Sequence, residues 1–320
     1  MTTTNTELKP VEYAAVEVGE TLGPLELTVD DHLLKTYAWS LDDHHPWHRD
    51  AASSPSGDRV APAAFFLGEL LRLLNTRYDP NRDLGLHQRE EVWFDSPARL
   101  GETVRLEGRI VEKYVKRGRG YYVTEAEARS TADGRLICRH RAIEAVEIGD
   151  PTKLGTGSAA AATQQRRVVG EYPQDRAPAS YARPDVAVGT PLPTLTKVVH
   201  QDQISVYSNV ASFWRTTHTD LAVARGQGLD TTLAQGLMNA CYVSELATGF
   251  FGPEWLTAGH LELAFVAPMA PEDEVRVRGV VSDTSTKDDA RWVEAEVWVE
   301  RLTDGRKLAV GWADTLLRAV

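Results

Sequence analysis

The chain has 320 residues, of which 42% are hydrophobic and 25% are charged, and its formal net charge at pH 7 is -11. This composition is typical of a globular protein with a buried core, and the length suits two domains of about 150 residues. The negative charge disfavours general binding to nucleic acids, whose phosphates it repels. No apolar run approaches the roughly 20 residues that a membrane span requires, so we expect no membrane contact.

The N-terminal residues 1–6 lack the basic and apolar regions of a secretion signal. Cys138 and Cys241 do not occupy equivalent places in the two halves of the chain. Two isolated thiols are more typical of a reducing compartment than of a disulfide. We therefore expect a cytoplasmic protein.

One arrangement of residues occurs twice. Gly19, Leu22, Tyr37, His48 and Asp50 recur 170 positions later as Gly189, Leu192, Tyr207, His218 and Asp220. Further on the offset is 171, and Phe94, Pro97, Val104, Gly108 and Asp133-Gly134-Arg135 recur as Phe265, Pro268, Val275, Gly279 and Asp304-Gly305-Arg306. An offset that survives one small insertion indicates two copies of one domain.

In the first copy, a short amphipathic segment at 30–39 is followed by a polar loop that contains His48. The apolar run at 62–74 predicts a long helix wrapped by other structure, with Pro62 in its first turn, where its missing N–H costs nothing. Alternating patterns at 104–115, 121–129 and 136–148 predict three strands. Asp133-Gly134 predicts a hairpin turn between the last two strands.

A stretch without hydrophobic periodicity follows and predicts a linker at 150–184. The second copy then repeats the order, with helices at 201–209 and 233–247 and strands at 275–282, 292–300 and 307–317. We expect an α+β protein of two tandem domains, residues 1–149 and 185–320. In each, an antiparallel sheet would wrap a long helix.

The residues best suited to chemistry lie between the first two helices. Asp43 and His48 are five residues apart on a loop stiffened by Pro46, and both can point into one cavity. A carboxylate and an imidazole there can share a water, one group accepting a proton and the other donating one. The residue five positions before His218 is Phe213, so the first copy holds the pair and the second a lone histidine.

The segment Asp43-His44-His45-Pro46-Trp47-His48-Arg49-Asp50 resembles the motif Asp-x-Asn-Pro-x-His-x-Asp of MaoC-like (R)-specific enoyl-CoA hydratases, the hydratase 2 family. The family fold is the hot dog, a long helix wrapped in an antiparallel sheet, and double-hot-dog members fuse two copies with one competent site. The resemblance implies a hydro-lyase, an enoyl-thioester hydratase or 3-hydroxyacyl-thioester dehydratase, with Asp43 and His48 as the catalytic pair. It implies no cofactor beyond the coenzyme A or phosphopantetheine of the substrate.

The enolate oxygen of such a reaction needs hydrogen-bond donors. The amides of Ala63 and Ala64, at the start of the predicted helix, are the candidates, and Gly236 of the second copy is a lesser one. His45 and Trp47 stand where the family has Asn and an aliphatic residue. We expect these two side chains, with Phe65 and Gln235, to line a pocket reshaped for a specialised acyl chain.

The first copy also contains a basic hairpin whose counterpart in the second copy is acidic. Its cationic residues are Lys113, Lys116, Arg117 and Arg119. They could bind the phosphates of coenzyme A or of an acyl carrier protein, or they could form an ordinary solvated turn. An acyl carrier protein and a second copy of this chain are the macromolecular partners that the sequence leaves open.

Several alternatives remain at this point. The Asp and His residues at 42–48 could bind zinc, but adjacent histidines diverge in an extended loop, so we expect no metal. The rival functions are a hot-dog thioesterase with Glu69 as its carboxylate, a pathway-specific lyase on an unusual substrate, and a non-catalytic subunit that binds acyl thioesters. We interpret His218 as structural, Tyr37 and Tyr207 as loop anchors, and Asp50 and Asp220 as loop-fixing groups or helix caps.

Overall fold

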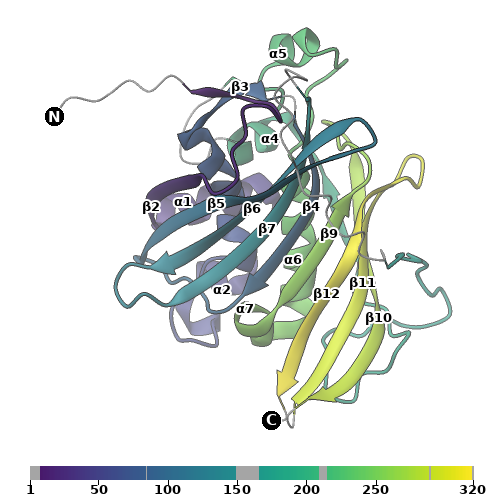
Figure 1. Cartoon of the computed structure of the whole chain (residues 1–320). Coiled ribbons are helices and arrows are strands. Elements are labelled where there is room, and N and C mark those ends of the chain that lie inside the picture. Colours follow the sequence, from purple (N-terminus) through teal and green to yellow (C-terminus); the bar gives the residue numbers. More distant parts are fainter. Residues whose placement is uncertain (1–7, 84, 149–165, 209–214, 288–289, 319–320) are drawn as a thin grey trace.

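The computed structural model describes residues 8–83, 85–148, 166–208, 215–287 and 290–318. Over these residues ten strands form one sheet, with helices on one of its faces (Figure 1). The predicted α+β class is confirmed. A further pair of short strands, β1 (Lys9–Val11) and β3 (Tyr78–Asp83), lies apart from the large sheet.

The order of the strands in the large sheet reflects the sequence repeat. The first half contributes β2 (Thr21–Thr28), β5 (Thr103–Lys116), β6 (Arg119–Ser130), β7 (Leu136–Val146) and β4 (Leu86–Phe94). The second half continues with β9 (His260–Phe265), β12 (Lys307–Arg318), β11 (Ala290–Arg301), β10 (Glu274–Lys287) and β8 (Leu195–Val198). The second order is the first one reversed, as expected of two copies joined edge to edge.

The two halves meet where β4 pairs with β9. This pairing is antiparallel and places Val92 opposite Leu261 at the centre of the sheet. Both side chains are fully buried. Because the central strands hydrogen-bond across the junction, neither half leaves a free sheet edge there.

The helices connect and cover the strands. They are α1 (Asp31–Leu41), α2 (Pro46–Arg49), α3 (Leu67–Arg72), α4 (Gln201–Ser208), α5 (Leu221–Gly226), α6 (Gly236–Phe251) and α7 (Trp255–Ala258). The 3₁₀ turns are η1 (Ala51–Ser53), η2 (Ala63–Phe66), η3 (Leu73–Thr76) and η5 (Gly252–Glu254). Helix α6 packs on β4, β9, β10, β11 and β12, so it lies across both halves. None of the described helices combines the length and the apolar character needed to span a bilayer.

The expectation of one long helix at 62–74 is wrong. The segment is helical, but it consists of η2, α3 and η3 in succession. Only the second copy has the long helix, α6, and it is buried on most of its faces. The 3₁₀ turns tighten both ends of α3, where the amide or carbonyl groups lack the partners of a continuing α-helix.

The predicted hairpins are confirmed. Strands β6 and β7 pair antiparallel on either side of Asp133-Gly134, and β11 and β12 do so around Asp304-Gly305. Gly134 and Gly305 have φ values of 72° and 67°, a left-handed conformation that disfavours other residues. The register of both hairpins therefore follows from local sequence.

The described part of the predicted linker packs against the second half. Arg166 forms an ion pair with Glu294 on β11, and the Tyr172 hydroxyl donates to the carbonyl of Leu192 at 2.6 Å. The amide of Ala182 donates to the carbonyl of Phe250, at the end of α6. Residues 149–165 of the linker lie outside the described residues.

Candidate active site

Asp43 is the residue that follows the C-cap of α1, Asp42. Helix α1 closes at Asp42, whose left-handed backbone (φ 54°) reverses the chain. The amide of Asp43 then donates to the carbonyl of Ala38 at 2.9 Å, and its Oδ1 accepts from the amide of His45 at 3.2 Å. These contacts hold a residue that is only 5% exposed.

The imidazole of His48 lies in α2, a short helix that begins at Pro46, and it is 3% exposed. Its Nδ1 is 2.8 Å from the carbonyl oxygen of Val60, which can only accept a hydrogen bond. Nδ1 therefore carries the proton, and Nε2 presents its lone pair. Nε2 lies 3.8 Å from Oδ2 of Asp43, so the two predicted groups face each other inside the protein.

The loop around His48 is fastened by Arg59. Its Nε donates to the carbonyl of His48 at 2.9 Å, and its Nη1 lies 2.7 Å from Oδ1 of Asp31 at the start of α1. The amide of Val60 donates back to the carbonyl of Trp47 at 3.1 Å. Both ends of the loop are thus held before any ligand binds.

Burial sets the protonation of the histidine. It lowers the pKa of His48, against the opposing effects of the Asp43 carboxylate and the Val60 carbonyl, and the net pKa lies below the ordinary 6.5. Desolvation disfavours the charged imidazolium more than the nearby carboxylate favours it. His48 is therefore neutral near pH 7, and its Nε2 can accept a proton.

The residues expected in the substrate pocket fall in different places. The ring of His45 packs edge-on against Trp47, with centroids 4.6 Å apart, and lies 5.6 Å from His48. Burial also lowers the pKa of His45. Phe65 instead packs on Tyr37, with ring centroids 5.1 Å apart, and Gln235 precedes α6 in the second half. Of the four, His45 and Trp47 are the ones beside the Asp43–His48 pair.

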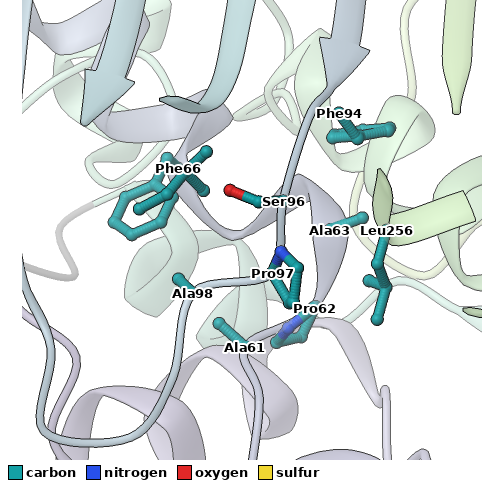
Figure 2. A pocket seen from close by; sticks show the side chains of 10 residues that line it. Ala61, Pro62, Ala63, Phe66, Phe94, Ser96, Pro97, Ala98 and Leu256 are labelled. Carbon is teal, nitrogen blue, oxygen red and sulfur yellow. The ribbon is translucent and has the colours of Figure 1, made fainter. Parts of the chain in front are cut away.

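The predicted oxyanion amides lie at the start of η2. Ala63 and Ala64 are its first residues, where amides have no helical acceptor, and Phe65 is the first to donate back, to Pro62. Figure 2 shows an apolar pocket at this turn, lined by Ala61, Pro62, Ala63, Phe66, Phe94, Ser96, Pro97, Ala98, Ile137 and Leu256. Asp43 and His48 do not line it. Gly236 lies at the start of α6.

The basic hairpin lies far from this pair. Val60 forms a β-bridge with Arg99, shortly before β5 begins at Thr103. The hairpin tip is at the other end of β5, roughly 45 Å along a strand of that length. Lys113 directs its Nζ to the carbonyls of Val16 at 2.8 Å and Tyr13 at 3.3 Å, whereas Lys116, Arg117 and Arg119 are exposed. The structure does not bring these cations together with Asp43 and His48.

The second copy keeps the histidine in the same setting. Nδ1 of His218 is 2.8 Å from the carbonyl oxygen of Leu233, as Nδ1 of His48 is from that of Val60. Phe213, in the place of the carboxylate, lies outside the described residues. The caps are confirmed: Asp50 accepts from the amide of Ala52, and Asp220 accepts from those of Ala222 and Val223.

Glu69 and His44, named above for a thioesterase and a zinc site, have other partners. Glu69 forms a buried ion pair with Arg72, whose Nε donates to Oε2 at 3.2 Å. His44 is exposed, and its Nε2 lies 3.2 Å from Oδ1 of Asp42. In the part of the chain that the structure describes, no cluster of three or more His, Cys, Asp or Glu residues is placed to hold a metal ion.

Sequence patterns do not predict two groups from the second half that contact the end of α1, nor the carboxylate that pairs with one of them. Lys197 of β8 donates through Nζ to the carbonyl of Asp42 at 2.7 Å and lies 2.6 Å from Oε2 of Glu245 on α6. Gln203 of α4 donates to the carbonyl of Trp39 at 3.0 Å. No motif marks these residues, because their role depends on how the two copies pack.

The duplicated sheet with one helical layer is the double hot dog fold. Solved structures share this fold at low sequence identity. A MaoC-like dehydratase superposes with a TM-score of 0.72 at 18% identity, over 96% of this chain and 100% of that one. A putative MaoC domain protein dehydratase from Chloroflexus aurantiacus gives 0.71 at 9% identity, over 99% and 100%.

A conserved hypothetical protein from Mycobacterium tuberculosis, described as a double hotdog fold, gives a TM-score of 0.68 at 14% identity, over 96% of this chain and 98% of that one. The resemblance to double-hot-dog MaoC-like proteins is therefore confirmed for the fold. No protein-family model matches the sequence, and no curated protein matches it either.

Proposed function

We propose that the protein adds water to, or removes it from, the α,β-position of an acyl thioester. The observation that carries this proposal is the buried pair, with Nε2 of His48 facing Oδ2 of Asp43 at 3.8 Å. Neither atom carries a proton when the imidazole is neutral and the carboxylate ionised. One water or substrate hydroxyl can therefore donate to one of them from about 2.8 Å and lie near both.

In the hydration direction, one member of the pair removes a proton from this water as its oxygen bonds to Cβ. The π bond between Cα and Cβ breaks, and its electron pair moves toward the thioester oxygen. The pair then returns to Cα the proton taken from the water, so both members regain their starting protonation. Dehydration is the reverse. The amides of Ala63 and Ala64 are the proposed donors to the enolate oxygen, because the start of a helical segment carries partial positive charge.

The acyl carrier is proposed as coenzyme A or a phosphopantetheine-bearing carrier protein, and no other cofactor is needed for this chemistry. His45 and Trp47, beside the pair, would shape the acyl end of the site. We do not assign the phosphates of that carrier to Lys116, Arg117 and Arg119, because these residues lie about the length of β5 away from the pair.

The test follows crotonyl-CoA through loss of its alkene absorbance, with free thiol measured separately. Wild-type protein should consume the alkene without releasing thiol. Asp43→Asn and His48→Ala should each lower kcat by about 100-fold or more, the usual contribution of a general acid or base. Asp58→Asn, which alters an exposed carboxylate near the same loop, is the matched control and should keep the wild-type rate.

Thiol release without alkene loss would indicate a thioesterase instead. Full activity in a folded Asp43→Asn/His48→Ala double variant would remove the assignment. A panel of branched and longer enoyl thioesters extends the test to a pathway-specific lyase. Binding without turnover across that panel would favour a non-catalytic subunit.

A further inference from the structure

Two charged residues of the second half lie against the segment that carries Asp43. Lys197 is 6% exposed, and its ammonium lies 2.7 Å from the carbonyl oxygen of Asp42 and 2.6 Å from Oε2 of Glu245. Asp42 immediately precedes Asp43 and closes α1 in a left-handed conformation. The position of the Asp43 backbone therefore depends on a cation from the other half of the molecule.

The equivalent place in the first half holds different residues. The offset of 173 residues that relates Val60 to Leu233, the carbonyl partners of the two histidines, also relates Arg72 to Glu245. Arg72 donates through Nη1 to the carbonyls of Tyr207 and Ser208, at 3.3 and 3.1 Å, near the end of α4. Each half thus supplies a cation that binds the end of a helix in the other half: Arg72 binds the end of α4, and Lys197 binds the end of α1. The cation beside the Asp43–His48 pair is the lysine, and Glu245 is its partner.

Glu245 is also electrostatically linked to Asp43. Burial and the negative charges of Asp43 and Asp42 raise the pKa of Glu245 to about 7, although Lys197 opposes them. The groups that face Glu245 are Lys197 from β8, Asp42 and Asp43 from the end of α1, and Tyr242 from α6 itself. Lys197 therefore binds one carbonyl and one carboxylate, and the charge on that carboxylate interacts with Asp43.

We propose that Lys197 and Glu245 are positioning residues of the Asp43–His48 site, supplied by the second domain. Lys197 fixes the turn that carries Asp43, and Glu245 holds Lys197 and acts on Asp43 through its own charge. This inference rests on the proposed function for its kinetic consequences, but its structural part is independent of turnover. It gives the second domain, which has Phe213 in the place of Asp43, a share in the site.

The experiment compares Lys197→Met with Arg72→Met. The second variant removes the equivalent contact at the end of α4, away from the Asp43–His48 pair. Hydrogen exchange is followed by mass spectrometry over residues 38–48, together with kcat and KM for crotonyl-CoA. Lys197→Met should speed exchange in this segment and lower kcat by about 10-fold or more, with KM changed less than about 3-fold, since small misplacements of reacting groups are costly. Arg72→Met should leave exchange in this segment and kcat near wild type.

Glu245→Gln addresses the charge without removing Lys197. It should abolish a step in kcat near pH 7, and Glu245→Asp should restore it. These two variants also decide the question if Lys197→Met does not fold. Equal exchange in Lys197→Met and wild type, or kcat profiles that are the same in Glu245→Gln and wild type, would overturn the inference.

If the wild-type protein turns over no thioester, the proposed function fails. The exchange comparison then decides alone whether Lys197 positions Asp43.

Discussion

Tyr37 and Tyr207, equivalent residues of the two copies, meet at one sulfur atom. The hydroxyl of Tyr37 donates to Sγ of Cys241 at 3.2 Å, and that of Tyr207 lies 3.3 Å from the same atom. Their ring centroids are 6.3 Å apart, and both side chains are almost completely buried. Burial raises the pKa of each far above its usual range, so both remain protonated. The two tyrosines, expected to anchor loops, therefore contact each other and Cys241 where the two halves meet.

Tyr37→Phe removes one of these hydrogen bonds and keeps the ring. We expect the free energy of unfolding to fall by about 0.5–1.5 kcal/mol, the usual net value of a buried hydrogen bond. Urea denaturation measures this directly, with Tyr207→Phe as its matched partner. A large loss of kcat in a stable Tyr37→Phe variant would instead indicate that the hydroxyl takes part in the reaction.

The acid side of the pH profile should belong to His48. Its pKa is below 6.5 because of burial, and only the neutral imidazole can accept a proton. We expect kcat/KM for hydration to fall with a slope of one as the pH drops below 6.5, in addition to the step near pH 7 expected from Glu245. This limb should persist in Glu245→Gln, because it does not arise from Glu245. A limb centred clearly above pH 7 would contradict the assignment.

A second pH effect concerns stability rather than turnover. Burial alone would lower the pKa of His87, but Glu144 and Glu90 outweigh it and raise this pKa to about 9. The folded pKa exceeds the unfolded one, so this stabilisation is complete below pH 6.5 and is lost as the pH rises through 9.

We expect the free energy of unfolding to drop by up to about 3 kcal/mol between pH 6.5 and 10, and this drop should be smaller in His87→Gln. Denaturation series at several pH values test it. His260, whose pKa is also raised to about 9, near Asp314 and Glu91, contributes in the same direction. His260→Gln therefore serves as the comparison variant. An unchanged pH dependence in both variants would refute the explanation.

His218 should be needed for stability and not for turnover. It keeps the bond from Nδ1 to the carbonyl of Leu233, and burial lowers its pKa. His218→Leu is expected to cost about 1 kcal/mol of unfolding free energy, since it leaves a part-buried carbonyl without its donor. The rate with crotonyl-CoA should remain within about 2-fold of wild type. A loss of activity comparable to that of His48→Ala would show that the second copy also works in catalysis.

Much of the architecture follows from local patterns in the sequence. Alternation of apolar residues and the Asp-Gly turns determined the long hairpins, because side-chain direction in a strand has a period of two. The repeat identified two copies, and the spacing of Asp43 and His48 on one proline-stiffened loop was enough to pair them. Asp50 and Asp220 could be read as caps for the same reason, since a cap acts within a few residues of its own position.

The tertiary structure decided what depends on contacts between the copies. The pairing of β4 with β9 joins the two sheets. The helical segment at 62–74 consists of a 3₁₀ turn, a short α-helix and a second 3₁₀ turn, a division that no local pattern predicts. Lys197 and Glu245 reach the Asp43 turn across the junction of the halves, and the basic hairpin lies a strand length away from it. Sequence order carries no information on such distances, because residues far apart in the chain are brought together or separated only when the core packs.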